Sequence, residues 1–129
     1  MTRILVIEDD PSVTTLLIDL LEHEGYEVAT AADGLEGLFK IRNAGVDAAL
    51  LDVMMPDIDG SRVLRQLHEE HDGGLPFPIL VLTGSPEGAR RCRELLGADR
   101  VIDKPFDPMV LLDRLRAVLG SDHPGGPTS

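Results

Sequence analysis

The sequence has little of what several kinds of chemistry need. Its 129 residues include one cysteine and no tryptophan, and only 3% are aromatic. A single cysteine excludes a disulfide framework and a cysteine-based zinc site within one chain. Cations are scarce too, because 12 Lys and Arg face 23 Asp and Glu, which gives a formal net charge of −11. This acid excess disfavours a domain that binds nucleic acid by itself.

Long hydrophobic runs are also missing. The apolar runs reach four or five residues, whereas a membrane-spanning helix needs roughly twenty. The chain passes from Met1-Thr2-Arg3 directly into an apolar run, without the separate apolar region and cleavage site of a secretory signal. We therefore expect a cytoplasmic protein without a membrane partner. The length suits one domain with its own core.

Short apolar runs supply the strand signal. Three of them, residues 4–7, 48–51 and 79–82, are apolar throughout rather than alternating with polar residues. Continuous runs of this kind are typical of strands covered on both faces, as in a parallel sheet. Two more polar candidates, 27–30 and 101–102, fit the edges of such a sheet.

Between the runs lie segments with apolar residues at helical spacing. Three of these segments open on the same signal, an Asp or Ser followed by proline, at Asp10, Ser85 and Asp107. The side chain caps the first turn, and proline suits the first helical position. The other two helices are marked by Leu35, Leu38 and Phe39 after Asp33, and by Val63, Leu64 and Leu67.

Five strands that alternate with five helices predict an α/β fold. Crossovers between parallel strands are right-handed, which gives a doubly wound (βα)₅ sandwich. With the two polar strands at the edges, the five-stranded parallel sheet has the order 2-1-3-4-5, as in flavodoxin-like folds. We expect the domain to span residues 1–120 and a flexible, linker-like tail to span 121–129.

Charged and polar residues directly follow the apolar runs. In an open parallel sheet, ligands bind at the carboxyl ends of the strands, near the point where the strand order reverses. We therefore expect these side chains to converge, apart from Asp10, which is explained by capping. They are Glu8 and Asp9 after the first run, Asp52 after the third, Thr83 after the fourth and Lys104 after the fifth.

Such a cluster suits phosphoryl transfer assisted by Mg²⁺. Crowded carboxylates repel one another, and a small hard cation relieves that repulsion while keeping some of its own waters. One carboxylate can then attack phosphorus to form an acyl phosphate. The Thr83 hydroxyl and the Lys104 ammonium group would stabilise negative charge on the phosphoryl oxygens.

These residues also stand in motifs that occur together in one family. The motifs are Glu8-Asp9-Asp10 after the first run, Leu51-Asp52 through Pro56 to Gly60, Leu82-Thr83-Gly84, and Asp103-Lys104-Pro105-Phe106. In this order and at these spacings, the chain resembles the CheY-like receiver domains of two-component response regulators. The resemblance covers Thr2 to Leu119.

The resemblance implies a role for each site residue. Asp52 would be the phospho-acceptor, and Thr83 and Lys104 would contact the phosphoryl oxygens. Mg²⁺ would be bound by Glu8, Asp9, Asp52 and the backbone carbonyl of Met54. The Lys104–Pro105 bond is expected to be cis. The phosphoryl donor would be a sensor histidine kinase or a phosphotransfer protein, and the domain would be a switch rather than an enzyme that acts on other substrates.

The output side departs from the family pattern. Receiver domains usually carry Tyr or Phe three residues before the lysine, but here the position is Val101. The expected output face comprises the fourth helix, fifth strand and fifth helix, where seven cations meet six acids between residues 86 and 119. Asp99 and Arg114 match residues that pair across this face in winged-helix regulators, so a homodimer could form there. Arg100 stands where those proteins commonly have an acid.

Other functions fit the residues less well. A haloacid-dehalogenase-like phosphatase would need a second Asp two residues after the nucleophile, where this chain has Met54. A flavin carrier would need more aromatic rings, and a degenerate receiver would lack part of the acidic, Thr and Lys set. We expect His68 and His71 to lie at a solvated helix end, and Cys92 on the half-buried side of a helix.

Overall fold

A central parallel sheet organises the chain in the computed structural model, which describes residues 2–52, 60–72 and 75–121. The strands are β1 (Arg3–Ile7), β2 (Glu27–Ala31), β3 (Ala48–Asp52), β4 (Ile79–Thr83) and β5 (Val101–Asp103). All neighbours pair in parallel, in the order β2-β1-β3-β4-β5. The predicted fold and strand order are therefore confirmed.

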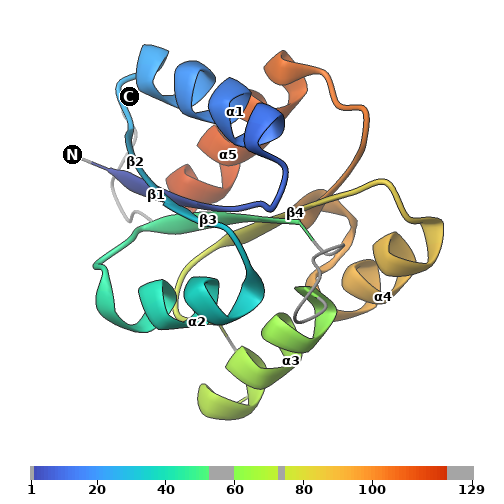
Figure 1. The fold of residues 1–129 in the computed structure, drawn as a ribbon. Helices are drawn as coiled ribbons and strands as arrows, with labels where there is room; N and C mark the ends of the chain where they lie inside the picture. The colour runs from blue at the N-terminus through green and yellow to red at the C-terminus, as the bar shows by residue number, and fades with distance from the viewer. Residues whose placement is uncertain (1, 53–59, 73–74, 122–129) are drawn as a thin grey trace.

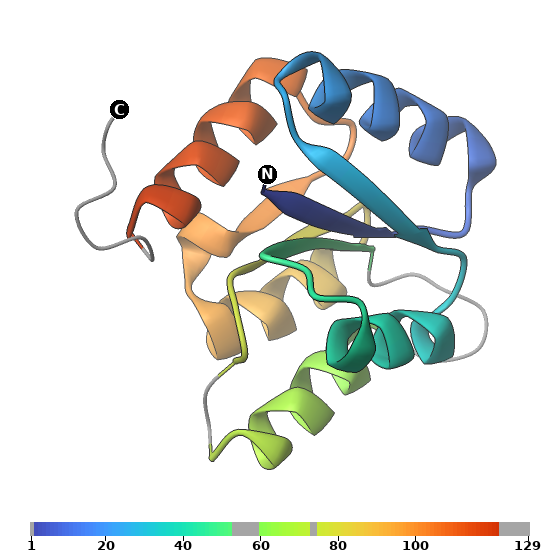
Figure 2. The same cartoon turned by 90° about the vertical axis from the view of Figure 1, so that its left-hand side faces the viewer.

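Five α-helices and a short 3₁₀ turn connect the strands. They are α1 (Pro11–His23), α2 (Gly34–Asn43), α3 (Gly60–Glu70), α4 (Pro86–Leu96), η1 (Ala98–Arg100) and α5 (Pro108–Ser121). Helices α1 and α5 cover one face of the sheet, and α2, α3 and α4 cover the other (Figures 1 and 2). No helix in these described ranges is long and apolar enough to cross a membrane.

Alternation along the strands divides the core between the two faces. On β1, Ile4 and Val6 belong to the cluster under α1 and α5, whereas Leu5 and Ile7 belong to the cluster under α2, α3 and α4. All four side chains are at most 1% exposed. Burial on both faces explains why the central strands are apolar throughout.

The helix caps form as predicted. The carboxylate of Asp10 accepts a hydrogen bond from the backbone N–H of Ser12, and that of Asp33 accepts one from Glu36. The Ser85 hydroxyl accepts from the N–H of Gly88. These side chains pair with N–H groups that would otherwise have no partner, and so they fix where each helix begins. The start of each helix in turn limits the path of the loop that follows the preceding strand.

Helix α2 turns a different side to the sheet than its large apolar residues indicate. Of Leu35, Leu38 and Phe39, only Leu38 is buried, while the other two are 63% exposed. The reason is Gly37, where an added Cβ would lie 2.8 Å from Cδ1 of Ile7. The missing side chain lets α2 approach β1 closely, and this contact sets the rotation of the helix.

The expected boundary at residue 120 falls inside the last turn of α5, which runs to Ser121. The remainder of the predicted tail, residues 122–129, lies outside the described residues.

Candidate functional site

Three carboxylates meet at the carboxyl ends of the two central strands β1 and β3. Glu8 and Asp9 follow β1, and Asp52 is the last residue of β3. Their carboxylate oxygens can all lie within 4.8 Å of one another. Glu8 and Asp52 are each 4% exposed, whereas Asp9 is exposed to solvent. The sequence brings these acids together because β1 and β3 are adjacent and run in parallel.

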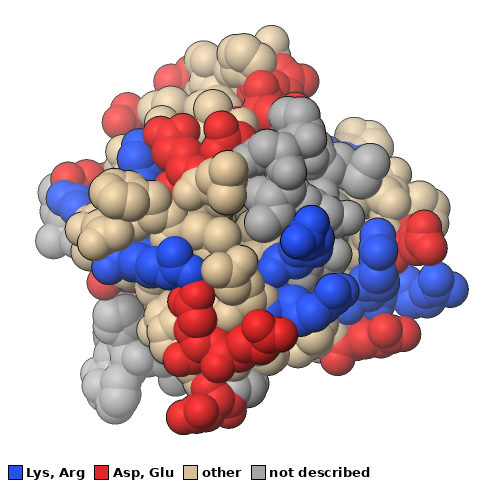
Figure 3. Space-filling model, turned by 60° about the horizontal axis from the view of Figure 1, so that its bottom comes forward, with Lys and Arg blue, Asp and Glu red and all other residues tan. Residues whose placement is uncertain are grey.

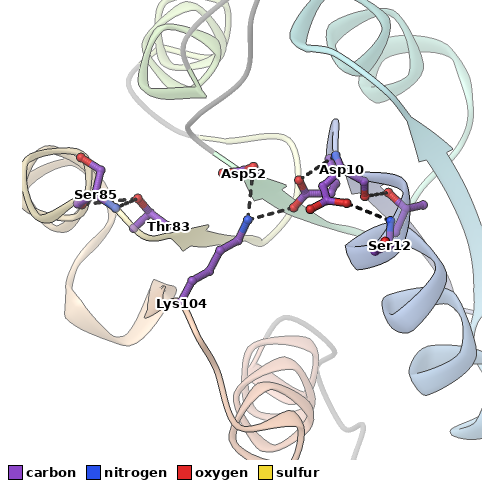
Figure 4. Close-up of polar contacts among 8 residues, drawn as sticks. Asp10, Ser12, Asp52, Thr83, Ser85 and Lys104 are labelled. Carbon is purple, nitrogen blue, oxygen red and sulfur yellow. Dashed lines mark hydrogen bonds and ion pairs between the residues drawn. The ribbon is translucent and has the colours of Figure 1, made fainter.

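Lys104 joins this acidic cluster from the other side (Figure 4). Its Nζ lies 3.1 Å from Oε1 of Glu8 and 3.3 Å from Oδ2 of Asp52. Its backbone N–H donates to the carbonyl of Thr83, and the Lys104–Pro105 bond is cis, as expected. Burial alone would lower the pKa of Lys104, but the carboxylates of Asp52 and Glu8 outweigh it and raise the pKa above its ordinary value. The lysine is therefore fully charged at neutral pH.

Crowding and burial act most strongly on Glu8. Burial raises its pKa from 4.5 to about 7. The N–H of Asp10, which donates to Glu8 Oε2 at 3.1 Å, works against this rise, and the neighbouring Asp52 carboxylate adds to it. The single ammonium group of Lys104 therefore only partly balances the three carboxylates that the fold brings together here.

This donor set fits Mg²⁺. The ion prefers a few carboxylate oxygens together with waters. The cluster offers the buried carboxylates of Glu8 and Asp52 beside the solvent-exposed carboxylate of Asp9. Met54, expected to give its backbone carbonyl, lies outside the described residues.

Thr83 ends β4 at the same edge of the sheet, but its hydroxyl is engaged elsewhere. The side chain is fully buried. Its Oγ1 accepts a hydrogen bond from the Ser85 N–H at 3.0 Å and lies 3.4 Å from the Ser85 carbonyl oxygen (Figure 4). The sequence indicated the position of Thr83 but not this link to the residue that caps α4.

Val101, the first residue of β5, stands where receiver domains usually have an aromatic side chain. Val101 is 4% exposed and packs in the core beneath α2, α3 and α4. Arg114 of α5 donates through Nη1 to the carbonyl of Val101 at 3.0 Å and to that of Asp99 at 3.4 Å. Arg114 therefore contacts the backbone carbonyl of Asp99 in the same chain, whereas the matching residues of winged-helix regulators pair across the dimer face.

The remaining candidates do not join the site. Among the described residues, the one group of three or more acids, histidines or cysteines close enough to hold a metal is the acidic cluster, so His68 and His71 are not part of such a group. His68 Nε2 is buried without a hydrogen-bond partner, so His68 is not fully solvated as expected. Cys92 is fully buried rather than half-buried, because the core side of α4 includes it.

A parallel sheet in this order, with buried acids and a lysine at its carboxyl edge, defines the CheY-like α/β class of signalling domains. The model of the response regulator receiver domain matches residues 4–116. The chain belongs to this family. It is the receiver domain of a two-component response regulator, a signalling phospho-acceptor rather than a classical enzyme.

Curated relatives agree with this assignment. The chain is 41% identical over 128 residues to the alkaline phosphatase synthesis transcriptional regulatory protein PhoP of Bacillus subtilis, covering 98% of this chain and 52% of the relative. It is 45% identical over 129 residues to the response regulator MprA of Mycobacterium sp. strain KMS, covering 98% and 55%. The chain thus spans about half the length of these relatives.

Solved structures show the same fold. A CheY-like receiver domain protein from Methanospirillum hungatei matches with a TM-score of 0.84 and 34% identity, over 98% of this chain and 99% of that one. The chemotaxis protein CheY4 of Vibrio cholerae matches with a TM-score of 0.77 and 33% identity, over 92% and 98%. The phosphatase and flavin-carrier alternatives are therefore set aside.

Proposed function

We propose that Asp52 accepts a phosphoryl group from a phosphohistidine on a sensor kinase or phosphotransfer protein. The observation that carries this proposal is the placement of the Asp52 carboxylate beside Glu8 and Asp9, with the Lys104 ammonium 3.3 Å away. An oxygen of Asp52 attacks phosphorus, the phosphorus–nitrogen bond breaks, and the electron pair stays on the histidine nitrogen. The product is an acyl phosphate on Asp52.

Glu8, Asp9 and Asp52 would bind Mg²⁺ here, with the Met54 carbonyl as a further ligand. The ion would supply the positive charge that one lysine does not. Lys104 is already placed to meet a phosphoryl oxygen, because its ammonium group contacts the acceptor carboxylate. A pocket of about 270 Å³ opens beside Glu8 and Asp9, and three threonines are among the residues that line it.

Thr83 would report phosphorylation to α4. For its hydroxyl to donate to a phosphoryl oxygen on Asp52, Thr83 must give up its 3.4 Å contact with the Ser85 carbonyl, because the hydroxyl has one proton to donate. Since Ser85 also caps α4, the exchange loosens the start of that helix. Val101 has no ring to reorient, so α4 carries the signal to the α4–β5–α5 face without an aromatic step.

The whole regulator would pass this signal to an output domain or partner, and the α4–β5–α5 face could also hold a homodimer. Two relatives of roughly double length bear the names of a transcriptional regulatory protein and a response regulator. In this arrangement residues 1–120 form the receiver, and 121–129 connect it onward. The domain works in the cytoplasm, and its net charge of −11 leaves any contact with nucleic acid to another part of the protein.

Intact mass after incubation with acetyl phosphate tests the acceptor. We expect a gain of one phosphoryl group that requires Mg²⁺ and disappears in Asp52→Asn. Asp10→Asn is the matched control, because it also removes one acid from the same edge of the sheet but keeps a capping side chain. Labelling of Asp52→Asn equal to that of the unchanged protein would place the acceptor elsewhere.

A further inference from the structure

The carboxyl end of β2 is held by more than its neighbour in the sheet. β2 is an edge strand, so one side of its backbone faces no other strand of the described sheet. The carbonyl of Ala31 faces β1 and accepts a hydrogen bond from the Glu8 N–H at 3.0 Å. Successive carbonyls of a strand point in opposite directions, so the carbonyl of Thr30 faces away from β1. An edge strand presents such groups without a partner in the sheet.

Helix α2 supplies the partners that this edge lacks. Lys40 donates through Nζ to the Thr30 carbonyl and lies 3.1 Å from Oε2 of Glu36. The other carboxylate oxygen of Glu36, Oε1, accepts a hydrogen bond from the Ala32 N–H at 2.9 Å. These contacts tie α2 to the backbone on both sides of Ala31. We call Glu36 and Lys40 together the β2 latch.

The β2 latch differs from an ordinary charge pair on a helix surface. Exposed pairs of that kind contribute little, and Figure 3 shows Lys and Arg side chains next to Asp and Glu on the side formed by α2, α3 and α4. Each member of the β2 latch also bonds to the backbone outside its own helix. The Ala32 N–H and Lys40 lower the pKa of Glu36 below its ordinary value, so Glu36 is ionised at neutral pH.

The segment that the β2 latch holds lies against the acidic cluster. Residues 30–32 are among those that line the pocket of about 270 Å³ beside Glu8 and Asp9. The Glu8 N–H bonds to the middle residue of this segment, so the position of the β2 end affects the backbone that carries both acids. Because the carboxylates of the cluster repel one another, their close approach depends on a backbone that cannot spread apart.

We propose that Lys40 is a positioning residue for the magnesium site. Through the Thr30 carbonyl and Glu36, it holds the end of β2 against the backbone of Glu8, and so keeps the acidic cluster placed to bind Mg²⁺. This inference rests on the proposed function, because it requires that the acidic cluster binds the ion. Lys40 acts on the geometry of the ligands and does not need to touch the ion or the phosphoryl group.

The expected effect of removing the Lys40 ammonium group is moderate. Losing a group that bonds directly to a metal ligand costs about ten- to a hundredfold in metal affinity, and the β2 latch acts one step further away, through the backbone. We therefore expect Lys40→Met to weaken Mg²⁺ binding about fivefold. It should also speed hydrogen exchange of the Glu8 amide, whose acceptor is held less firmly. Lys40→Arg can still donate to both oxygens and should restore the affinity.

Titration of the full chain with MgCl₂ at fixed pH, followed by the amide NMR shifts of Glu8 and Asp9, measures this affinity. Arg42→Met is the matched control. It also removes a cation of α2 from an ion pair, in this case with Glu70 of α3, and it leaves the β2 latch intact. The affinity of Arg42→Met for Mg²⁺ should be unchanged. A loss of affinity shared by Arg42→Met and Lys40→Met would mean that any loosening of α2 suffices, and would overturn the proposal.

The two members of the β2 latch should act as one unit. Glu36→Ala should also weaken Mg²⁺ binding, and the double variant should lose little more than the stronger single change. Unchanged affinity in Lys40→Met, or full additivity of the two changes, overturns the proposal.

Labelling by acetyl phosphate separates this inference from the proposed function. At saturating Mg²⁺, Asp52 should be labelled equally in every variant, because the acceptor and Lys104 are untouched. If the unchanged chain binds no Mg²⁺, the metal site of the proposed function fails, and this inference fails with it. If the unchanged chain binds Mg²⁺ and is labelled while Lys40→Met binds Mg²⁺ as tightly, only the role of the β2 latch fails.

Discussion

The candidate site has two sides, which the fold holds in different ways. Glu8 and Asp52 extend from the central strands β1 and β3, where Ile7 and Leu51 are at most 1% exposed. On the other side, Thr83 bonds to Ser85 in the loop before α4, and Lys104 has a side chain that is 25% exposed. The core fixes the acidic side, while exchangeable polar contacts hold the other. Under the proposed function, phosphorylation would change the charge on the acidic side, and the side that holds Thr83 and Lys104 would respond by moving.

The largest effect on stability should come from removing charge from the acidic side. The folded state favours protonated Glu8, because its pKa is raised to about 7 from 4.5. Without Mg²⁺, this group contributes most stability below pH 4.5 and loses it as the pH rises to 7. Glu8→Gln should raise the free energy of unfolding at pH 8 by about 3 kcal/mol and leave it little changed at pH 4.5.

Urea unfolding with EDTA at both pH values measures this difference. Glu36→Gln is the control, since Glu36 is a partly exposed acid whose pKa is lowered, rather than raised, by the Ala32 N–H and by Lys40. An equal effect of Glu8→Gln at the two pH values would mean that burial does not penalise the Glu8 charge.

Removing the cation should act in the opposite direction. Lys104→Met leaves Glu8 and Asp52 buried without their shared ammonium group. We expect the free energy of unfolding at pH 8 to fall by about 2 kcal/mol, less than for a wholly buried pair because the lysine is partly exposed. Added Mg²⁺ should restore much of this loss. Arg93→Met, which breaks an exposed pair with Asp103, should cost under about 1 kcal/mol.

A smaller effect is expected at the hydrogen-bonded side. Thr83→Ala removes a buried hydroxyl and should destabilise the fold by about 1.5 kcal/mol. Asp52 should still be phosphorylated, but hydrogen exchange in the first turn of α4 should no longer respond to acetyl phosphate. Thr83→Ser keeps the hydroxyl and should keep the response. If Thr83→Ala responds as the unchanged protein does, another group carries the signal.

The smallest effect concerns the cap itself. Ser85→Ala removes the acceptor for the Gly88 N–H but keeps the backbone groups that contact Thr83. We expect a loss of about 1 kcal/mol and faster hydrogen exchange in α4 even without phosphorylation. Ser85→Asp, which can still cap, should exchange as slowly as the unchanged protein. Faster exchange in both variants would show that capping does not limit α4.

The sequence predicted the fold and the meeting of Glu8, Asp9, Asp52 and Lys104, because both follow from chain order. A parallel sheet brings all strand ends to one edge, so the residues after each apolar run had to converge. The polarity of residues 27–30 and 101–102 correctly predicted the edge strands. The caps at Asp10, Asp33 and Ser85 were predictable for a similar reason, since they depend on neighbours within a few residues.

What the sequence did not predict depends on packing between distant segments. Glu8 and Asp9 are adjacent acids, and only the fold buries one and exposes the other. The engagement of the Thr83 hydroxyl by Ser85 depends on a loop conformation. Cys92 is buried more deeply than its helical position indicated, and α2 turns Phe39 outward because of a contact with β1.

The contact between Gly37 and Ile7 makes the outer surface of α2 depend on the absence of a side chain at position 37. An alanine at position 37 would normally favour a helix over glycine, yet here its Cβ would lie 2.8 Å from Cδ1 of Ile7, so the Ile7 side chain or α2 would have to shift. A larger residue at this position would need a different Ile7 side-chain conformation, a smaller residue in β1 or a tilt of α2, and a tilt would redirect Leu35 and Phe39. The glycine at position 37 therefore helps to determine which side chains α2 presents to solvent.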